Sequence, residues 1–152
     1  MDMTGEYRIP ASRETVWKAL NDPEVLKRSI PGCDDLQMTS ATEMTAKVSA
    51  KVGPVSAKFS GKVTLSDINP PVSYKISGEG QGGVAGFAKG GAEVNLVAEG
   101  SETILKYKAT AQVGGKLAQI GSRLIDGTAR KMANDFFNRF AAVMSPATGS
   151  GS

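Results

Sequence analysis

Few side chains in this sequence are equipped for catalysis. Its 152 residues include no histidine and one cysteine, Cys33. The lack of histidine excludes imidazole acid–base catalysis and histidine metal ligands, and a single cysteine excludes internal disulfides and cysteine-cluster metal sites. Because no imidazole is present to activate its thiol, we expect Cys33 to be a small apolar residue rather than a nucleophile. The sequence therefore predicts no catalytic residue, no metal site and no covalently bound cofactor.

Composition and charge narrow the class of protein. Hydrophobic residues make up 40% of the chain and charged residues 22%, which is typical of a soluble domain. The formal net charge of +3 comes without dense Lys/Arg stripes, so we expect no nucleic acid partner. The first eleven residues do not resemble a signal peptide, and no apolar stretch approaches 18 residues. We expect a cytoplasmic protein for which any membrane contact is peripheral.

The domain is expected to span residues 1–144. The remaining residues, 145–152 (SPATGSGS), have the composition of a flexible linker. We interpret this tail as either an artificial chain end or the start of a truncated tether.

Changes of hydrophobic period divide the chain into elements. Residues 3–9 predict a strand, Ser12 caps a first short helix, and Asp22-Pro23 starts a second that ends before Ile30. From Asp34 the period is two for about eighty residues, which predicts an antiparallel meander with one wet face. A single helix is then expected from Lys116 to about Met144. We predict an α+β helix-grip fold, with a curved sheet of about seven strands around the C-terminal helix.

The inner face of the predicted sheet is short of side-chain volume. Ten of the 25 inward positions on its five clearest strands are Ala or Gly: Ala46, Ala50, Ala57, Gly61, Gly78, Gly80, Ala92, Ala98, Ala109 and Ala111. Empty space in a core costs about 24 cal/mol per Å³. The helix must therefore approach the sheet closely, giving a solid core, or leave a cavity that a ligand fills. We favour the cavity.

The expected wall of this cavity is apolar, with two phenols. Its residues are Phe59, Val63, Tyr74, Ile76, Phe87, Leu96, Tyr107, Leu117, Ile120, Gly121, Leu124 and Ile125. Such a wall suits a long hydrocarbon ligand with a few polar atoms, and either tyrosine could donate to its polar end.

Lysines recur on the water-facing side of the predicted strands. We expect Lys47, Lys58, Lys62 and Lys106 to form a docking face for acidic lipid headgroups or an acidic partner. Solubility and protection of the sheet edge are the alternative explanation.

Three segments resemble a known family. The stretch from Pro10 to Leu26, followed by Ile30-Pro31-Gly32-Cys33, is similar to the N-terminal signature of the G subunit of carbon monoxide dehydrogenase, a family of the START-like (polyketide cyclase, SRPBCC) superfamily. The glycine-rich residues 82–91 and the helix opening at 114–121 also resemble that family. The resemblance implies a non-catalytic accessory protein of a molybdenum-containing carbon monoxide dehydrogenase or related hydroxylase. It also implies a role in placing that enzyme at the cytoplasmic membrane and coupling it to respiratory quinone.

Residues and resemblance together favour one function over two others. The favoured hypothesis is a carrier whose cavity holds an isoprenoid quinone, menaquinone-like, for the partner dehydrogenase. The first alternative is a structural membrane-recruitment adaptor without a ligand. The second is a small cyclase or dehydratase, which would need an acid or base in the pocket.

Overall fold

Local signals start the first two helices as the sequence predicts. In the computed structural model, which describes residues 1–144, β1 (Asp2–Ile9) leads into α1 (Arg13–Leu20) and α2 (Pro23–Ser29). The Ser12 side chain accepts a hydrogen bond from the Thr15 amide, and the Asp22 carboxylate accepts one from Glu24 at 2.9 Å. Each cap satisfies an amide that the helix leaves unpaired. The tail expected at 145–152 lies outside the described residues.

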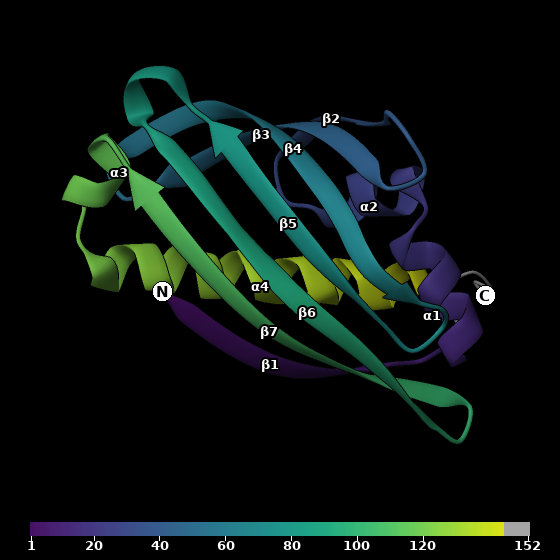
Figure 1. Ribbon diagram of the computed structural model, residues 1–152. Helices are drawn as coiled ribbons and strands as arrows, with labels where there is room; N and C mark the ends of the chain where they lie inside the picture. Colours follow the sequence, from purple (N-terminus) through teal and green to yellow (C-terminus); the bar gives the residue numbers. More distant parts are fainter. Residues whose placement is uncertain (145–152) are drawn as a thin grey trace.

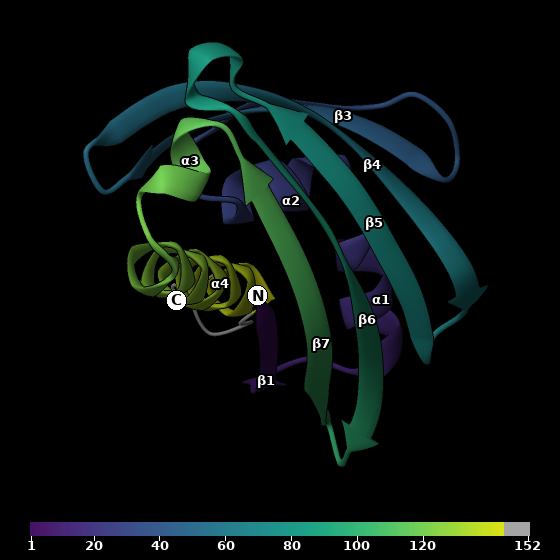
Figure 2. The same cartoon turned by 60° about the vertical axis from the view of Figure 1, so that its left-hand side comes forward.

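The remaining strands form one antiparallel sheet that curves around a helix (Figures 1 and 2). Its strands after β1 are β2 (Cys33–Met38), β3 (Glu43–Val52), β4 (Val55–Asn69), β5 (Ser73–Gln81), β6 (Phe87–Glu99) and β7 (Glu102–Gly114). The spatial order is β1-β7-β6-β5-β4-β3-β2, so the first strand lies beside the last. This confirms the predicted α+β fold, with seven strands on one sheet.

The C-terminal helix differs from the prediction in one place. In place of one helix from Lys116, the structure has α3 (Lys116–Gln119) and α4 (Ser122–Met144). The break falls at Gly121, whose φ of +104° is incompatible with an α-helix and is rarely adopted by other residues. The expectation of an unbroken helix was therefore wrong at this glycine.

The glycine-rich segment at 82–91 is also divided. Only its first half is a connection, which contains the short 3₁₀ turn η1 (Gly83–Ala85), and residues from Phe87 onward already belong to β6. A run of glycines usually indicates a turn, but glycine also occurs within strands where a sheet bends sharply. Residues 87–91 therefore alternate between the two faces of the sheet, as strand residues do.

The packed core occupies one end of the domain. It is built by α1, α2, the C-terminal half of α4 and the sheet residues that face them, including Leu65, Leu96 and Leu105. In α4 the buried residue is Phe140, near its C-terminal end, whose side chain is fully enclosed. The first half of α4 contributes no fully buried residue, so the two ends of the sheet differ in how they are filled.

Candidate functional site

The strand register places glycines side by side on the concave face of the sheet. Gly61 of β4 lies opposite Gly80 of β5, and Gly78 of β5 lies opposite Gly90 of β6. A Cβ on Gly90 would clash with the Thr110 carbonyl oxygen, so that backbone approach requires glycine. Because none of these positions carries a side chain, the middle of the inner wall is thin.

A cavity of about 750 Å³ lies between this thin wall and the first half of α4. That volume is within the range of small-molecule binding sites. Its walls come from β3 to β7, α3 and α4, and they are lined by Met1, Val48, Ala50, Val52, Phe59, Gly80, Ala88, Ala111, Gln112, Val113, Leu117, Ala118, Gly121, Ser122, Ile125, Asp126, Thr128, Ala129 and Met132. Small and aliphatic side chains predominate, so the cavity suits an apolar guest.

One face of α4 forms the floor of the cavity. Ser122, Ile125, Asp126, Ala129 and Met132 recur at steps of three and four residues, which puts them on one side of a helix. The Gly121 break lets α3 fold over the end of the cavity, where Leu117 is buried. The helix is thus held away from the sheet at this end and packed against it at the other.

The β3–β4 hairpin forms another side of the cavity. Its tip extends beyond the end of β5, because β4 pairs with β5 only from Ser60 onward. A Cβ on Gly53 at the tip would contact the side chains of Ile120 and Leu124 at 3.4 Å. The hairpin therefore reaches the α3–α4 turn and walls the cavity on that side.

The opening of the cavity lies between β7 and the α3–α4 turn. The lining residues Gln112, Ala118, Gly121 and Ser122 are exposed. Pairing of β1 with β7 ends where Met1 and Ala111 exchange two hydrogen bonds of 2.9 and 3.0 Å. Within residues 1–144 no strand pairs with the edge of β7 beyond Ala111, so the edge is open there.

Among the described residues that line the cavity, Asp126 is the one with a charged side chain. It is half-buried on the cavity-facing side of α4, and within the described chain no hydrogen bond or ion pair is assigned to it. A carboxylate accepts hydrogen bonds and donates none when ionised. It therefore offers a place for a ligand group that carries a hydroxyl or another donor.

All the sequence-predicted lining residues except Phe87 fall into three groups. Phe59, Leu117, Gly121 and Ile125 line the cavity. Val63, Tyr74, Ile76, Leu96 and Tyr107 face the same side of the sheet but belong to the packed end or its border. Ile120 and Leu124 lie near the β3–β4 tip, where a Cβ added to Gly53 would meet them, and Leu124 is 50% exposed.

Phe87 lies on the other face of the sheet. Its neighbour Ala88 lines the cavity, and successive residues of a strand point to opposite faces. On the convex side the Phe87 ring covers Gly114, where a Cβ would clash with it. The alternation that places Ala88, Ala92 and Val94 inward already contained this information.

Neither expected tyrosine reaches the cavity. Tyr74 is buried against Trp17, with ring centroids 5.3 Å apart in an edge-on arrangement, and burial raises the pKa of its phenol. Tyr107 packs with Tyr7 and Phe137 in an aromatic cluster between β1, β7 and α4, and burial raises the pKa of its phenol as well. Both phenols make packing contacts and lie outside the lining of the cavity.

Most of the observed lining residues are small, whereas the prediction from sequence favoured large apolar side chains. Val48, Ala50, Val52, Ala111 and Val113 alternate inward in the sequence, but small residues were counted as missing volume rather than as wall. The hydrophobic pattern places Asp126 off the apolar stripe of α4, yet it lies four residues after Ser122 and three before Ala129, which also line the cavity. That spacing was the signal that could have placed a carboxylate at the site.

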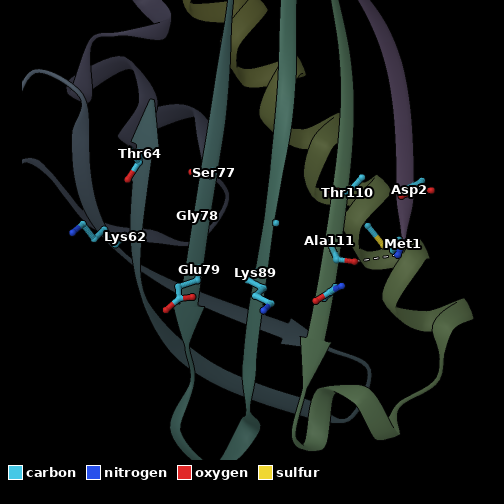
Figure 3. Close-up of a pocket in the computed structure, with 12 residues that line it drawn as sticks. Met1, Asp2, Lys62, Thr64, Ser77, Gly78, Glu79, Lys89, Thr110 and Ala111 are labelled. Atoms are coloured by element: carbon cyan, nitrogen blue, oxygen red, sulfur yellow. Dashed lines mark hydrogen bonds between the residues drawn. The ribbon is translucent and has the colours of Figure 1, made fainter. Parts of the chain in front are cut away.

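A second hollow, of about 740 Å³, lies on the convex face of the sheet (Figure 3). Lys62, Thr64, Ser77, Glu79, Lys89 and Thr110 surround it, from four adjacent strands. Two of the four lysines proposed for docking are already in ion pairs, Lys62 with Glu43 at 3.1 Å and Lys106 with Glu6 at 3.6 Å. Lys47 and Lys58 are exposed and are in none of the assigned ion pairs of residues 1–144. This face is polar and carries both signs of charge.

Cys33 and potential metal ligands are the remaining groups that could do chemistry. Cys33 is half-buried, its thiol donates to the Asp35 carbonyl, and desolvation raises its pKa. A raised pKa makes the thiol less reactive. Among residues 1–144 no group of three or more acidic, Cys or His residues could hold a metal, and no helix is long and apolar enough to cross a membrane.

Comparison with known proteins places these features in context. The family model of the carbon monoxide dehydrogenase G subunit (CoxG) matches residues 5–145. A conserved protein from Geobacillus kaustophilus is 30% identical, with a TM-score of 0.89 and coverage of 95% of each chain. A START superfamily protein from Mycobacterium smegmatis is 14% identical, with a TM-score of 0.69 over 94% of this chain and 96% of that one. A Rhizobium loti protein has a TM-score of 0.72 at 17% identity, covering 93% and 95%. A comparison with curated proteins finds no match.

Proposed function

Since this chain belongs to the CoxG family of carbon monoxide dehydrogenase accessory proteins, we propose that it is non-catalytic and carries an isoprenoid quinone for a molybdenum-containing dehydrogenase. The bound quinone links that enzyme to the quinone pool of the membrane. The observation that carries this proposal is the cavity of about 750 Å³, lined mainly by aliphatic and small side chains.

The apolar wall supports binding of an isoprenoid tail. Phe59, Val48, Val52, Ile125 and Met132 offer hydrocarbon surface from both the sheet and α4. Burial of apolar area contributes about 25 cal/mol per Å², and an isoprenoid chain has little polar surface to offset it. The tail would therefore exchange a bilayer for the cavity at small net cost.

The polar groups at the opening support placement of the quinone head there. Ser122 and Thr128 carry side-chain donors, and quinone carbonyl oxygens accept hydrogen bonds. The head would then lie near solvent, where a partner enzyme can reach it, while the tail occupies the interior.

Native mass spectrometry and solvent extraction of the purified protein test this proposal. We expect a co-purified quinone, or stoichiometric uptake of menaquinone added in detergent micelles. Protein that is empty and takes up no added quinone would contradict the proposal. The mass of the recovered quinone must also be unchanged, since a carrier does not alter its cargo.

A cyclase or dehydratase is the second candidate, and Asp126 is the observation that favours it. A carboxylate at an apolar cavity is a candidate general acid or base. Recovery of a bound molecule one water lighter than the one supplied, lost in Asp126→Asn, would support this candidate over the carrier.

A further inference from the structure

Three turns meet at the end of the domain opposite α1 and α2. They are the β3–β4 tip around Gly53, the η1 loop between β5 and β6, and the α3–α4 turn (Figure 1). A Cβ added to Gly53 at the hairpin tip would meet the side chains of Ile120 and Leu124 at 3.4 Å, so the tip lies close to the start of α4. The exposed cavity residues Ala118, Gly121 and Ser122 belong to the α3–α4 turn. We call this part of the molecule the open end.

The open end carries positive charge and no negative charge. Residues 50–60, 80–88 and 111–125 contain no Asp or Glu. They contain four basic residues, Lys51, Lys58, Lys116 and Arg123, all of them exposed. Among the ion pairs assigned in residues 1–144 none involves these four. The same is true of Lys47, Lys89 and Lys108 on the sheet, whereas Lys62, Lys75, Lys106 and Arg8 are paired with carboxylates. No assigned ion pair compensates these four charges, and the first carboxylate beyond them on α4 is Asp126, which lines the cavity.

The same end exposes aliphatic side chains. Val84 in the η1 loop is 85% exposed, the highest value among the exposed large hydrophobic residues of the described chain. Leu124 on the first turn of α4 is 50% exposed. Apolar side chains surrounded by lysine and arginine are typical of surfaces that insert shallowly into anionic bilayers.

We propose that the open end docks on a bilayer containing anionic phospholipids, with Val84 and Leu124 entering the headgroup region. Lys51, Lys58, Lys116 and Arg123 contact the lipid phosphates. This inference rests on the proposed quinone carrier and adds to it the surface through which cargo passes. A bilayer is favoured over an acidic protein because the cavity opens beside this surface, so an isoprenoid chain would cross with little exposure to water.

Vesicle binding by matched charge variants tests the docking surface. The variant K51S/K116S/R123S removes three basic residues from the open end, and the control K18S/K27S/R28S removes three exposed ones from α1 and α2. Both lower the formal net charge from +3 to zero. Each basic residue near an anionic surface is worth roughly a fivefold change in partitioning. We therefore expect the open-end variant to lose roughly a hundredfold on phosphatidylglycerol-containing vesicles, and the control to stay close to the unsubstituted protein.

A fluorescent reporter tests the orientation. Val84→Trp should be quenched by brominated phospholipids, while the native Trp17 in α1, at the opposite end, should not. Equal losses in the two charge variants, equal binding to neutral phosphatidylcholine vesicles, or quenching of Trp17 instead would each overturn the inference.

Failure of docking can be separated from failure of quinone binding. Quinone uptake is measured in detergent micelles, without vesicles. If the protein takes up quinone in micelles but does not bind vesicles, the docking inference is wrong and the carrier proposal stands. If the open-end variant then fails to bind the dehydrogenase, the surface belongs to an acidic protein face instead.

Discussion

A side chain added at Gly80 would meet Phe59 at ordinary contact distance. The Cβ built on Gly80 lies 3.8 Å from the Cβ of Phe59, and the φ of Gly80 is not in the left-handed region. Gly80 and Phe59 both line the cavity. The glycine therefore leaves open a space that a larger residue could occupy without backbone strain.

Gly80→Leu should fill part of the cavity and weaken quinone binding. The added side chain displaces roughly three methylene groups of the ligand, at about 0.8 kcal/mol each, so affinity should fall about 50-fold. Titration in micelles measures the effect. Ser77→Leu, three residues away on the convex face, is the control and should bind as the unsubstituted protein does. Equal affinities of the two variants would place the ligand elsewhere.

Asp126 should make the protein prefer a quinol to a quinone. Quinol hydroxyls can donate to the carboxylate, whereas quinone carbonyls can only accept. A hydrogen bond to a charged group is worth about 1.5–3 kcal/mol, which corresponds to a preference of roughly 10-fold or more. Anaerobic titration with each redox form measures it. Asp126→Asn, which also carries a donor, should reduce the preference, and an unchanged ratio would remove Asp126 from the site.

Alanine substitutions at two glycines near the start of α4 should change the free energy of unfolding in opposite directions. Gly121 has a φ of +104°, so Gly121→Ala should lower the free energy of unfolding by about 1–2 kcal/mol. Gly127 lies inside α4, with no atom within 4 Å of a built Cβ, so Gly127→Ala should raise it by about 1 kcal/mol. Urea unfolding of the pair checks both signs. A gain at Gly121 would show that the helix break is not required.

Alanine substitution of two phenylalanines should destabilise the protein more at the packed end of the domain than at the end that contains the cavity. Phe140 is fully buried, and Phe140→Ala should cost about 3–5 kcal/mol. Phe59 is half-buried beside the cavity, so Phe59→Ala should cost less than half as much, because little packing is lost. Both values come from denaturant unfolding of ligand-free protein. Similar costs would argue that the cavity is closed in solution.

Burial of Tyr74 should make stability fall in alkaline solution. The pKa of its phenol is raised in the folded state, so the unfolded chain loses this proton first, at about pH 10. The stabilisation is complete below pH 10 and declines above it, by about 1.4 kcal/mol per pH unit at most. Tyr74→Phe should show a smaller decline over the same range. Identical pH profiles would mean that Tyr74 is accessible to solvent in the native state.

The sequence by itself determined the faces of the elements. Alternation in β3 to β7 depends only on the period of two, and the caps at Ser12 and Asp22 depend only on neighbouring residues, so both could be predicted locally. The excess of Ala and Gly on the inner face likewise predicted a shortage of volume. These features need no knowledge of which strand ends meet which helix.

Only the tertiary structure decided where along each strand the core ends and the cavity begins. Tyr74, Ile76 and Gly80 share one face of β5, yet the first two lie toward the packed end and Gly80 lines the cavity. The packed end contains the fully buried Phe140, and the cavity end contains the helix break at Gly121. Contacts between residues so far apart in the chain leave no mark on local periodicity, because they depend on register and curvature summed over the whole sheet.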